Sequence, residues 1–73
     1  MNALKEQREM AMLSQAELAE KAGIGTAQVN KIENGRAVPW PRTVRKLAAA
    51  LECNLSDLAS LRTEKGETNG ESK

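Results

Sequence analysis

The chain has 73 residues, a net charge of +1, 40% hydrophobic residues, one aromatic residue and no histidine. This length allows one small domain, and scattered carboxylates with a single cysteine provide neither an acid–base pair for an enzyme nor a ligand set for zinc. We therefore expect a protein that is not an enzyme and that needs no cofactor and no metal.

The first third of the chain predicts two short helices. Good helix formers fill residues 2–12, where we expect the first helix. Ser14 followed three residues later by Glu17 is a capping box, so a second helix is predicted over 15–22. Gly23 can adopt the left-handed backbone conformation that closes a helix. The inward face of the second helix is predicted to comprise Leu18, Ala19 and Ala22.

The rest of the chain predicts three more helices. The first covers 26–33 and ends at Asn34 and Gly35, a dipeptide typical of turns. A proline suited to the first helical turn begins a helix over 41–51. A last short helix is expected over 55–61. The inward residues of the helices over 26–33 and 41–51 are predicted to be Val29, Ile32, Val44, Leu47, Ala48 and Leu51.

These elements predict an all-α fold, because strands would need more β-branched and aromatic residues. We expect a compact five-helix bundle in one domain over residues 1–62. Residues 63–73 contain no hydrophobic side chain, so burial cannot offset the entropy of ordering them. They are predicted to form a disordered polar tail.

The turn "AGIG" is too short for the helices on either side to pack at a shallow angle. It forces them to cross at ~90–120° and leaves the helix over 26–33 projecting from the domain. Ala19 and Gly23, one helical turn apart, are expected to permit close contact between the two helices. The outward residues of the helix over 26–33 are polar or small, and a helix fits the DNA major groove.

Three segments, "LSQAELAEKAGI", "IENGRAVP" and "TVRKLAAAL", occur in an order and spacing that resemble a known family. The chain from Leu4 through Leu58 is similar to the lambda-repressor-like helix-turn-helix domains of phage Cro and repressor proteins and of bacterial XRE-type regulators. The resemblance implies that helix 15–22 supports helix 26–33, which recognises DNA.

The resemblance also implies roles for single residues. Gln28 and Lys31 are the best base-reading candidates, because glutamine pairs with adenine and lysine donates to guanine. Gln15 is expected to bind a phosphate and to buttress the recognition helix. The positions implied to face or flank base edges are Thr26, Ala27, Gln28, Asn30 and Lys31. The positions implied to contact phosphates are Gln15, Asn34 and Arg36, with Arg42 and Arg45 as weaker candidates in a locally basic segment.

Two positions depart from the family pattern. Gly25 stands where relatives often carry a serine or threonine cap, although glycine is a tolerable cap. Trp40 stands where a small polar cap is common, and we expect it to cover the edge of the core rather than to contact DNA or a partner. Met10 and Met12 are likewise expected to fill the core.

Two functions remain open at this stage. The first is a sequence-specific transcriptional regulator of double-stranded DNA, a repressor that acts as a homodimer on half-sites ~34 Å apart. The alternative is an antitoxin or interaction module of the same fold with a protein partner, because Thr26 and Ala27 are weak base readers. With neither a secretion signal nor a membrane-spanning run, we expect no membrane contact and a cytoplasmic, nucleoid-associated protein of a bacterium or phage.

Overall fold

The computed structural model describes residues 2–63, and every regular element in that range is helical. The prediction of an all-α fold is confirmed. The predicted disordered tail over 63–73 lies, except for its first residue, outside the described residues. The helices are α1 (Ala3–Met10), α2 (Gln15–Ala22), α3 (Thr26–Glu33), α4 (Pro41–Leu51), a 3₁₀ helix η1 (Leu55–Leu58) and α5 (Ser60–Thr63).

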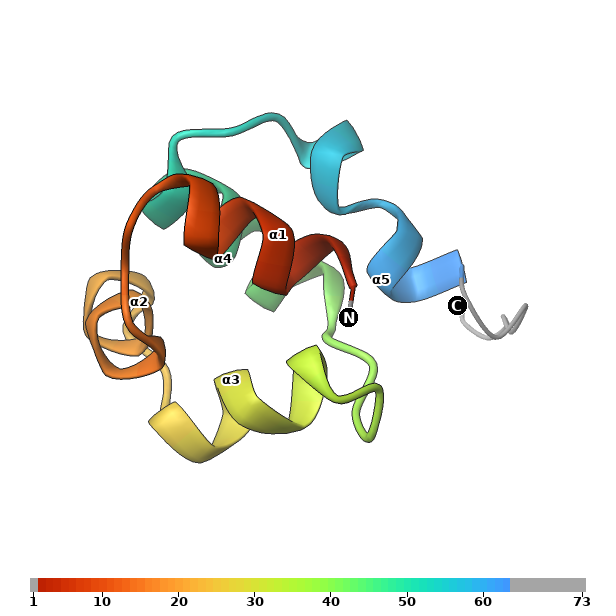
Figure 1. The fold of residues 1–73 in the computed structure, drawn as a ribbon. Helices are drawn as coiled ribbons and strands as arrows, with labels where there is room; N and C mark the ends of the chain where they lie inside the picture. The colour runs from red at the N-terminus through yellow and green to blue at the C-terminus, as the bar shows by residue number, and fades with distance from the viewer. Residues whose placement is uncertain (1, 64–73) are drawn as a thin grey trace.

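The helices surround one apolar core, to which each element from α1 to α5 contributes (Figure 1). The apolar stripes of α2, α3 and α4 face this core, and every residue predicted to point inward from them is buried. Burial of these stripes is the main favourable contribution to folding in so small a domain. The largest fully buried side chains are Leu4, Leu18, Val29, Ile32, Leu47 and Leu58.

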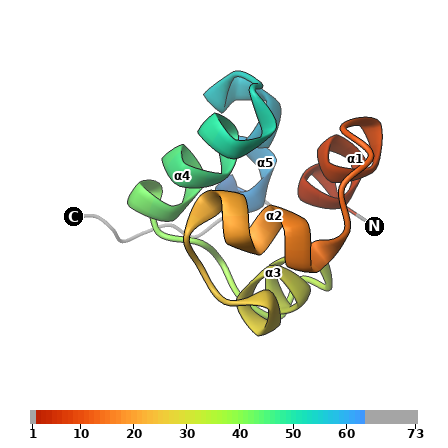
Figure 2. The same ribbon diagram turned by 90° about the vertical axis from the view of Figure 1, so that its left-hand side faces the viewer.

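Helices α2 and α3 cross steeply, as the short turn between them predicts. Figure 1 looks along α2 and shows α3 from the side, whereas the view turned by 90° in Figure 2 reverses the two. Gly23 closes α2 with a φ of 73°, which favours glycine. A Cβ at Gly23 would meet nothing within 4 Å, so the expectation of close contact there is wrong. The turn needs this glycine for its left-handed backbone.

Each helix from α1 to α4 ends in a Schellman motif, in which one left-handed residue turns the chain. The left-handed residues are Met12, Gly23, Gly35 and Glu52. In α1 the N–H of Leu13 donates to the carbonyl oxygen of Arg8 at 3.1 Å. Helix α1 therefore ends at Met10, two residues before the approximate boundary predicted from the sequence.

The same motif exposes both methionines that were expected to fill the core. Met10 is 76% exposed and Met12 is 89% exposed. The turn at Met12 brings Leu13 back against the core, which leaves the two methionine side chains pointing outward. The prediction of core packing for Met10 and Met12 is wrong.

Replacing Met12 with glycine is expected to raise the free energy of unfolding by about 1 kcal/mol, because a left-handed conformation costs a non-glycine residue about that much. The exposed methionine side chain contributes little packing that could be lost. Urea unfolding measures the change. The control is Met10→Gly at an exposed helical position, which is expected to lower the free energy of unfolding instead. A loss of stability in both variants would contradict this account of Met12.

The C-terminal part of the fold departs from the predicted single helix over 55–61. The chain forms η1 and then α5, with Ala59 between them. The Asp57 carboxylate accepts the N–H of Asn54 at 3.0 Å, which holds a tight first turn. The two short elements bury Leu58 and Leu61, so core contact rather than helix propensity sets the geometry here.

Trp40 does not cover the core. It is the N-cap residue of α4 and is 74% exposed, so the prediction of a plug is wrong. The buried residue of this loop is Pro39, whose carbonyl oxygen accepts a hydrogen bond from Arg62 at 2.6 Å. Because this bond and Pro41 fix the backbone on both sides, the indole is directed away from the interior.

Candidate nucleic-acid interface

Helix α3 has a buried face and an exposed face. Val29, Ile32 and Glu33 are buried against the rest of the domain. No loop of the described chain buries the opposite face. The five predicted base-reading positions, Thr26, Ala27, Gln28, Asn30 and Lys31, are all exposed. An exposed helical face of small and polar residues is the shape that enters a major groove.

A buried ion pair holds the C-terminal end of α3 against α1. The guanidinium of Arg8 donates through Nε to Oε2 of Glu33 at 2.5 Å and through Nη2 to Oε1 at 3.1 Å. Its Nη1 also donates to the carbonyl oxygen of Leu13 at 2.8 Å. The Glu33 side chain is only 3% exposed. This bidentate pair fixes the orientation of α3 in the domain.

The ion pair keeps Glu33 ionised. Burial is the largest influence and acts to raise the pKa of Glu33. Hydrogen bonds from Arg8 and Gln15, with the charges of Arg8 and Lys5, together outweigh burial and hold this pKa below its ordinary value. Glu33 is therefore a carboxylate at neutral pH, which can only accept hydrogen bonds.

The contribution of Glu33 to stability is expected to disappear in acid. Its pKa is lower in the folded state than in the unfolded state, so the contribution is complete above about pH 4.3 and is lost as the pH falls through the folded-state pKa. We compare the free energy of unfolding of the wild type and Glu33→Gln by urea titration at neutral and acid pH. The difference in the free energy of unfolding between the two proteins should become smaller in acid. A difference that does not change with pH would contradict the lowered pKa of Glu33 in the folded state.

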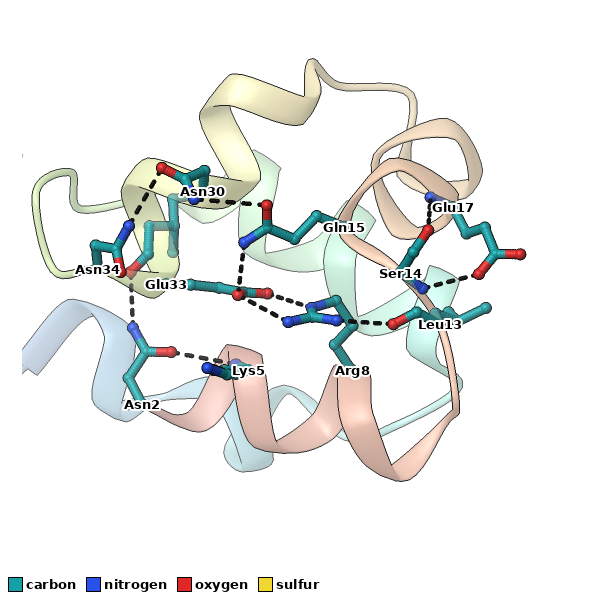
Figure 3. A network of polar contacts seen from close by, with 11 residues as sticks. Asn2, Lys5, Arg8, Leu13, Ser14, Gln15, Glu17, Asn30, Glu33 and Asn34 are labelled. Atoms are coloured by element: carbon teal, nitrogen blue, oxygen red, sulfur yellow. Dashed lines mark hydrogen bonds and ion pairs between the residues drawn. The ribbon is translucent and has the colours of Figure 1, made fainter.

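Three side-chain amides continue from Glu33 across the surface of α3 (Figure 3). Gln15, the first residue of α2, donates through Nε2 to Oε1 of Glu33 at 3.0 Å. Asn30 donates through Nδ2 to Oε1 of Gln15 at 3.5 Å, and Asn34 donates through Nδ2 to Oδ1 of Asn30 at 3.2 Å. Gln15 thus buttresses α3, as expected, through Glu33 and Asn30.

The comparisons with known proteins agree with this geometry. A family model described as Helix-turn-helix matches residues 4–58. The chain belongs to the XRE-type helix-turn-helix family. Membership of this family bears out the expectation that the domain is not an enzyme.

Two relatives of this helix-turn-helix chain come from Bacillus subtilis (strain 168). It is 43% identical to the uncharacterized HTH-type transcriptional regulator RghRB over 56 residues. This aligned segment covers 75% of the present chain and 40% of RghRB. It is 42% identical to the HTH-type transcriptional repressor RghR over 53 residues. This second aligned segment covers 71% of the present chain and 37% of RghR. The chain thus spans about two fifths of the length of these relatives. No solved structure matches it significantly.

The other predicted phosphate contacts of the helix-turn-helix domain lie on its surface. The side chains of Arg36, Arg42 and Arg45 are exposed, and within residues 2–63 none of them forms a hydrogen bond or ion pair. A shallow hollow beside the first turn of α4 is lined by Trp40, Pro41, Arg42, Thr43 and Arg45. Its two guanidinium groups offer charge to an anion.

Sequence reasoning missed the residues that orient α3. Arg8 follows Leu4 by four residues and Glu33 follows Val29 by four, so each charge lies on the buried stripe of its helix. That spacing was the available signal. Asn2 was also missed: it accepts the N–H of Lys5 as the N-cap of α1 and donates to the carbonyl oxygen of Ile32 at 2.7 Å. It thereby attaches the start of α1 to the end of α3.

The described residues contain neither a helix with the length and apolar character to span a bilayer nor a group of three metal-binding side chains.

Proposed function

We propose that this chain binds double-stranded DNA in a sequence-specific manner and represses transcription, with α3 inserted into the major groove. The exposed face of α3 is the observation that carries the proposal, because it combines small residues with Gln28 and Lys31. Gln28 can pair with adenine and Lys31 can donate to guanine. The relative RghR is an HTH-type transcriptional repressor, which supports repression as the outcome.

The phosphate contacts flank α3 in this proposal. Gln15 lies at the N-terminus of α2, where backbone N–H groups and the helix dipole favour an anion. Asn34 and Arg36 follow α3 directly and would contact the backbone beside the reading helix. Arg42 and Arg45 at the start of α4 would provide weaker contacts.

One α3 reads only one half-site, so we propose that the chain acts as a homodimer on a near-palindromic operator. Two copies related by twofold symmetry place their reading helices ~34 Å apart, one turn of the duplex. Analytical ultracentrifugation of the chain with its selected duplex determines the number of copies bound. A stable complex of one copy on a two-half-site duplex would contradict the dimer.

The experiment that tests the proposal is selection of bound duplexes from a random pool, followed by fluorescence anisotropy with the selected duplex at two salt concentrations. We expect tight binding to the selected sequence, weak binding to a scrambled duplex and a steep loss of affinity with salt. An absence of binding even at low salt would contradict DNA recognition. That result would favour the alternative of an antitoxin or interaction module, for which exposed Trp40 and Val38 offer apolar contact surface.

A further inference from the structure

The hydrogen bonds that start at Glu33 have a fixed direction. The Glu33 carboxylate accepts only, so Gln15 must turn its Nε2 toward Glu33 and its Oε1 outward. Oε1 of Gln15 also accepts only, so Asn30 must turn Nδ2 toward it and Oδ1 toward Asn34. Asn34 must then donate. We call Gln15, Asn30 and Asn34 the amide relay, and Figure 3 shows its course across α3.

This direction decides what the relay presents to a ligand. An amide nitrogen carries two hydrogens, and the relay uses one hydrogen from each nitrogen. The oxygens of Gln15 and Asn30 each accept one hydrogen bond within the relay. Gln15 and Asn34 each keep one amide N–H that the relay does not use. Such a donor suits a phosphate oxygen, because this oxygen accepts hydrogen bonds and carries negative charge.

We propose that Asn30 is a positioning residue that aligns the amides of Gln15 and Asn34 on one DNA phosphate, and that it does not read a base. This inference rests on the proposed DNA binding. Each polar atom of the Asn30 side chain already has a partner inside the protein. The amide is therefore held in the orientation of the relay and cannot turn its nitrogen and oxygen together toward a base edge, as a bidentate contact with adenine requires. Sequence preference then rests on the other exposed residues of α3, above all Gln28 and Lys31.

The first test uses the free protein and needs no DNA. In a ¹⁵N-labelled sample, Asn30→Ala should shift the side-chain amide resonances of both Gln15 and Asn34, because each loses a hydrogen-bond partner. The matched control is Gln28→Ala, an exposed residue of the same helix with no side-chain hydrogen bond in the described chain. It should leave both resonances in place. Unchanged resonances in Asn30→Ala would overturn the relay whatever the protein binds.

The second test uses the duplex selected by the wild type and a set of variants with one base pair changed. Asn30→Ala should weaken binding to every duplex by the same factor, roughly two- to tenfold, the loss expected for one or two hydrogen bonds. The ranking of the duplexes should not change. Loss of discrimination at one base pair would show that Asn30 reads that base and would overturn the proposal.

A single neutral phosphate identifies the partner of the relay. Duplexes that carry one methylphosphonate in place of a phosphate are compared, one position at a time. The replacement that weakens binding of the wild type should weaken binding of Asn30→Ala by a smaller factor. Equal effects in both proteins at every position would overturn the proposed alignment. If the wild type selects no duplex although its amide resonances respond to Asn30→Ala, the relay exists and the proposed DNA binding is what has failed.

Discussion

Replacing Arg8 with methionine is expected to lower the free energy of unfolding by about 3–5 kcal/mol, because the change leaves a buried carboxylate without its charge partner. The Glu33 side chain is 3% exposed and cannot regain the lost interaction from water. The carbonyl oxygen of Leu13 loses its donor in the same variant. Urea unfolding followed by circular dichroism measures the loss. A variant that is already unfolded without urea would show that the loss is at least as large as the whole stability of the domain.

The control for Arg8→Met is Arg45→Met, which removes an exposed arginine with no side-chain partner in the described chain. A surface change of this kind usually alters the free energy of unfolding by less than about 0.5 kcal/mol. Similar losses in the two variants would contradict the importance of the ion pair.

The double variant Arg8→Met with Glu33→Leu separates the two sources of the loss. A buried ion pair can often be replaced by apolar side chains at little cost, whereas removing one partner is strongly destabilising. We therefore expect the double variant to recover much of the stability lost in Arg8→Met. A double variant less stable than the single one would show that packing of the arginine stem, rather than the unpaired carboxylate, causes the loss.

The sequence predicted the helices and the buried stripes because local rules determine both. The Ser14 capping box begins α2, Pro41 begins α4, and apolar residues at helical spacing lie inward in each of these helices. The exposed positions of α3 could be predicted for the same reason. A helix with one apolar stripe must turn its remaining residues to solvent.

The errors lie where contacts distant in the sequence decide the structure. Helix propensity extended α1 two residues too far, because the packing of half-buried Leu13 against the core turns the chain at Met12. Size and apolar character placed Trp40 over the edge of the core, but aliphatic residues already close the small core and Trp40 is 74% exposed. The pairing of Arg8 with Glu33 joins residues 25 positions apart, and no local pattern specifies which cation a buried carboxylate meets.

Replacing Lys31 or Gln28 with alanine is expected to reduce the discrimination between DNA sequences by ~1–3 kcal/mol each. Both side chains are exposed on α3, and neither has a hydrogen bond or ion pair within the described chain. Truncation should therefore leave folding unchanged and act on the complex alone. The measurement is fluorescence anisotropy with the selected duplex and all its single base-pair variants.

The matched control for these two variants is Arg36→Ala, which removes an exposed charge just after α3. A phosphate contact carries no sequence information, so Arg36→Ala should weaken binding to all duplexes alike and reduce the salt dependence of affinity. Loss of preference should occur at one base pair for Gln28→Ala and at another for Lys31→Ala, because the two side chains leave α3 at different heights along the groove. If both variants kept wild-type affinity and preference while Arg36→Ala lost affinity, the protein would hold the DNA backbone without reading bases through α3.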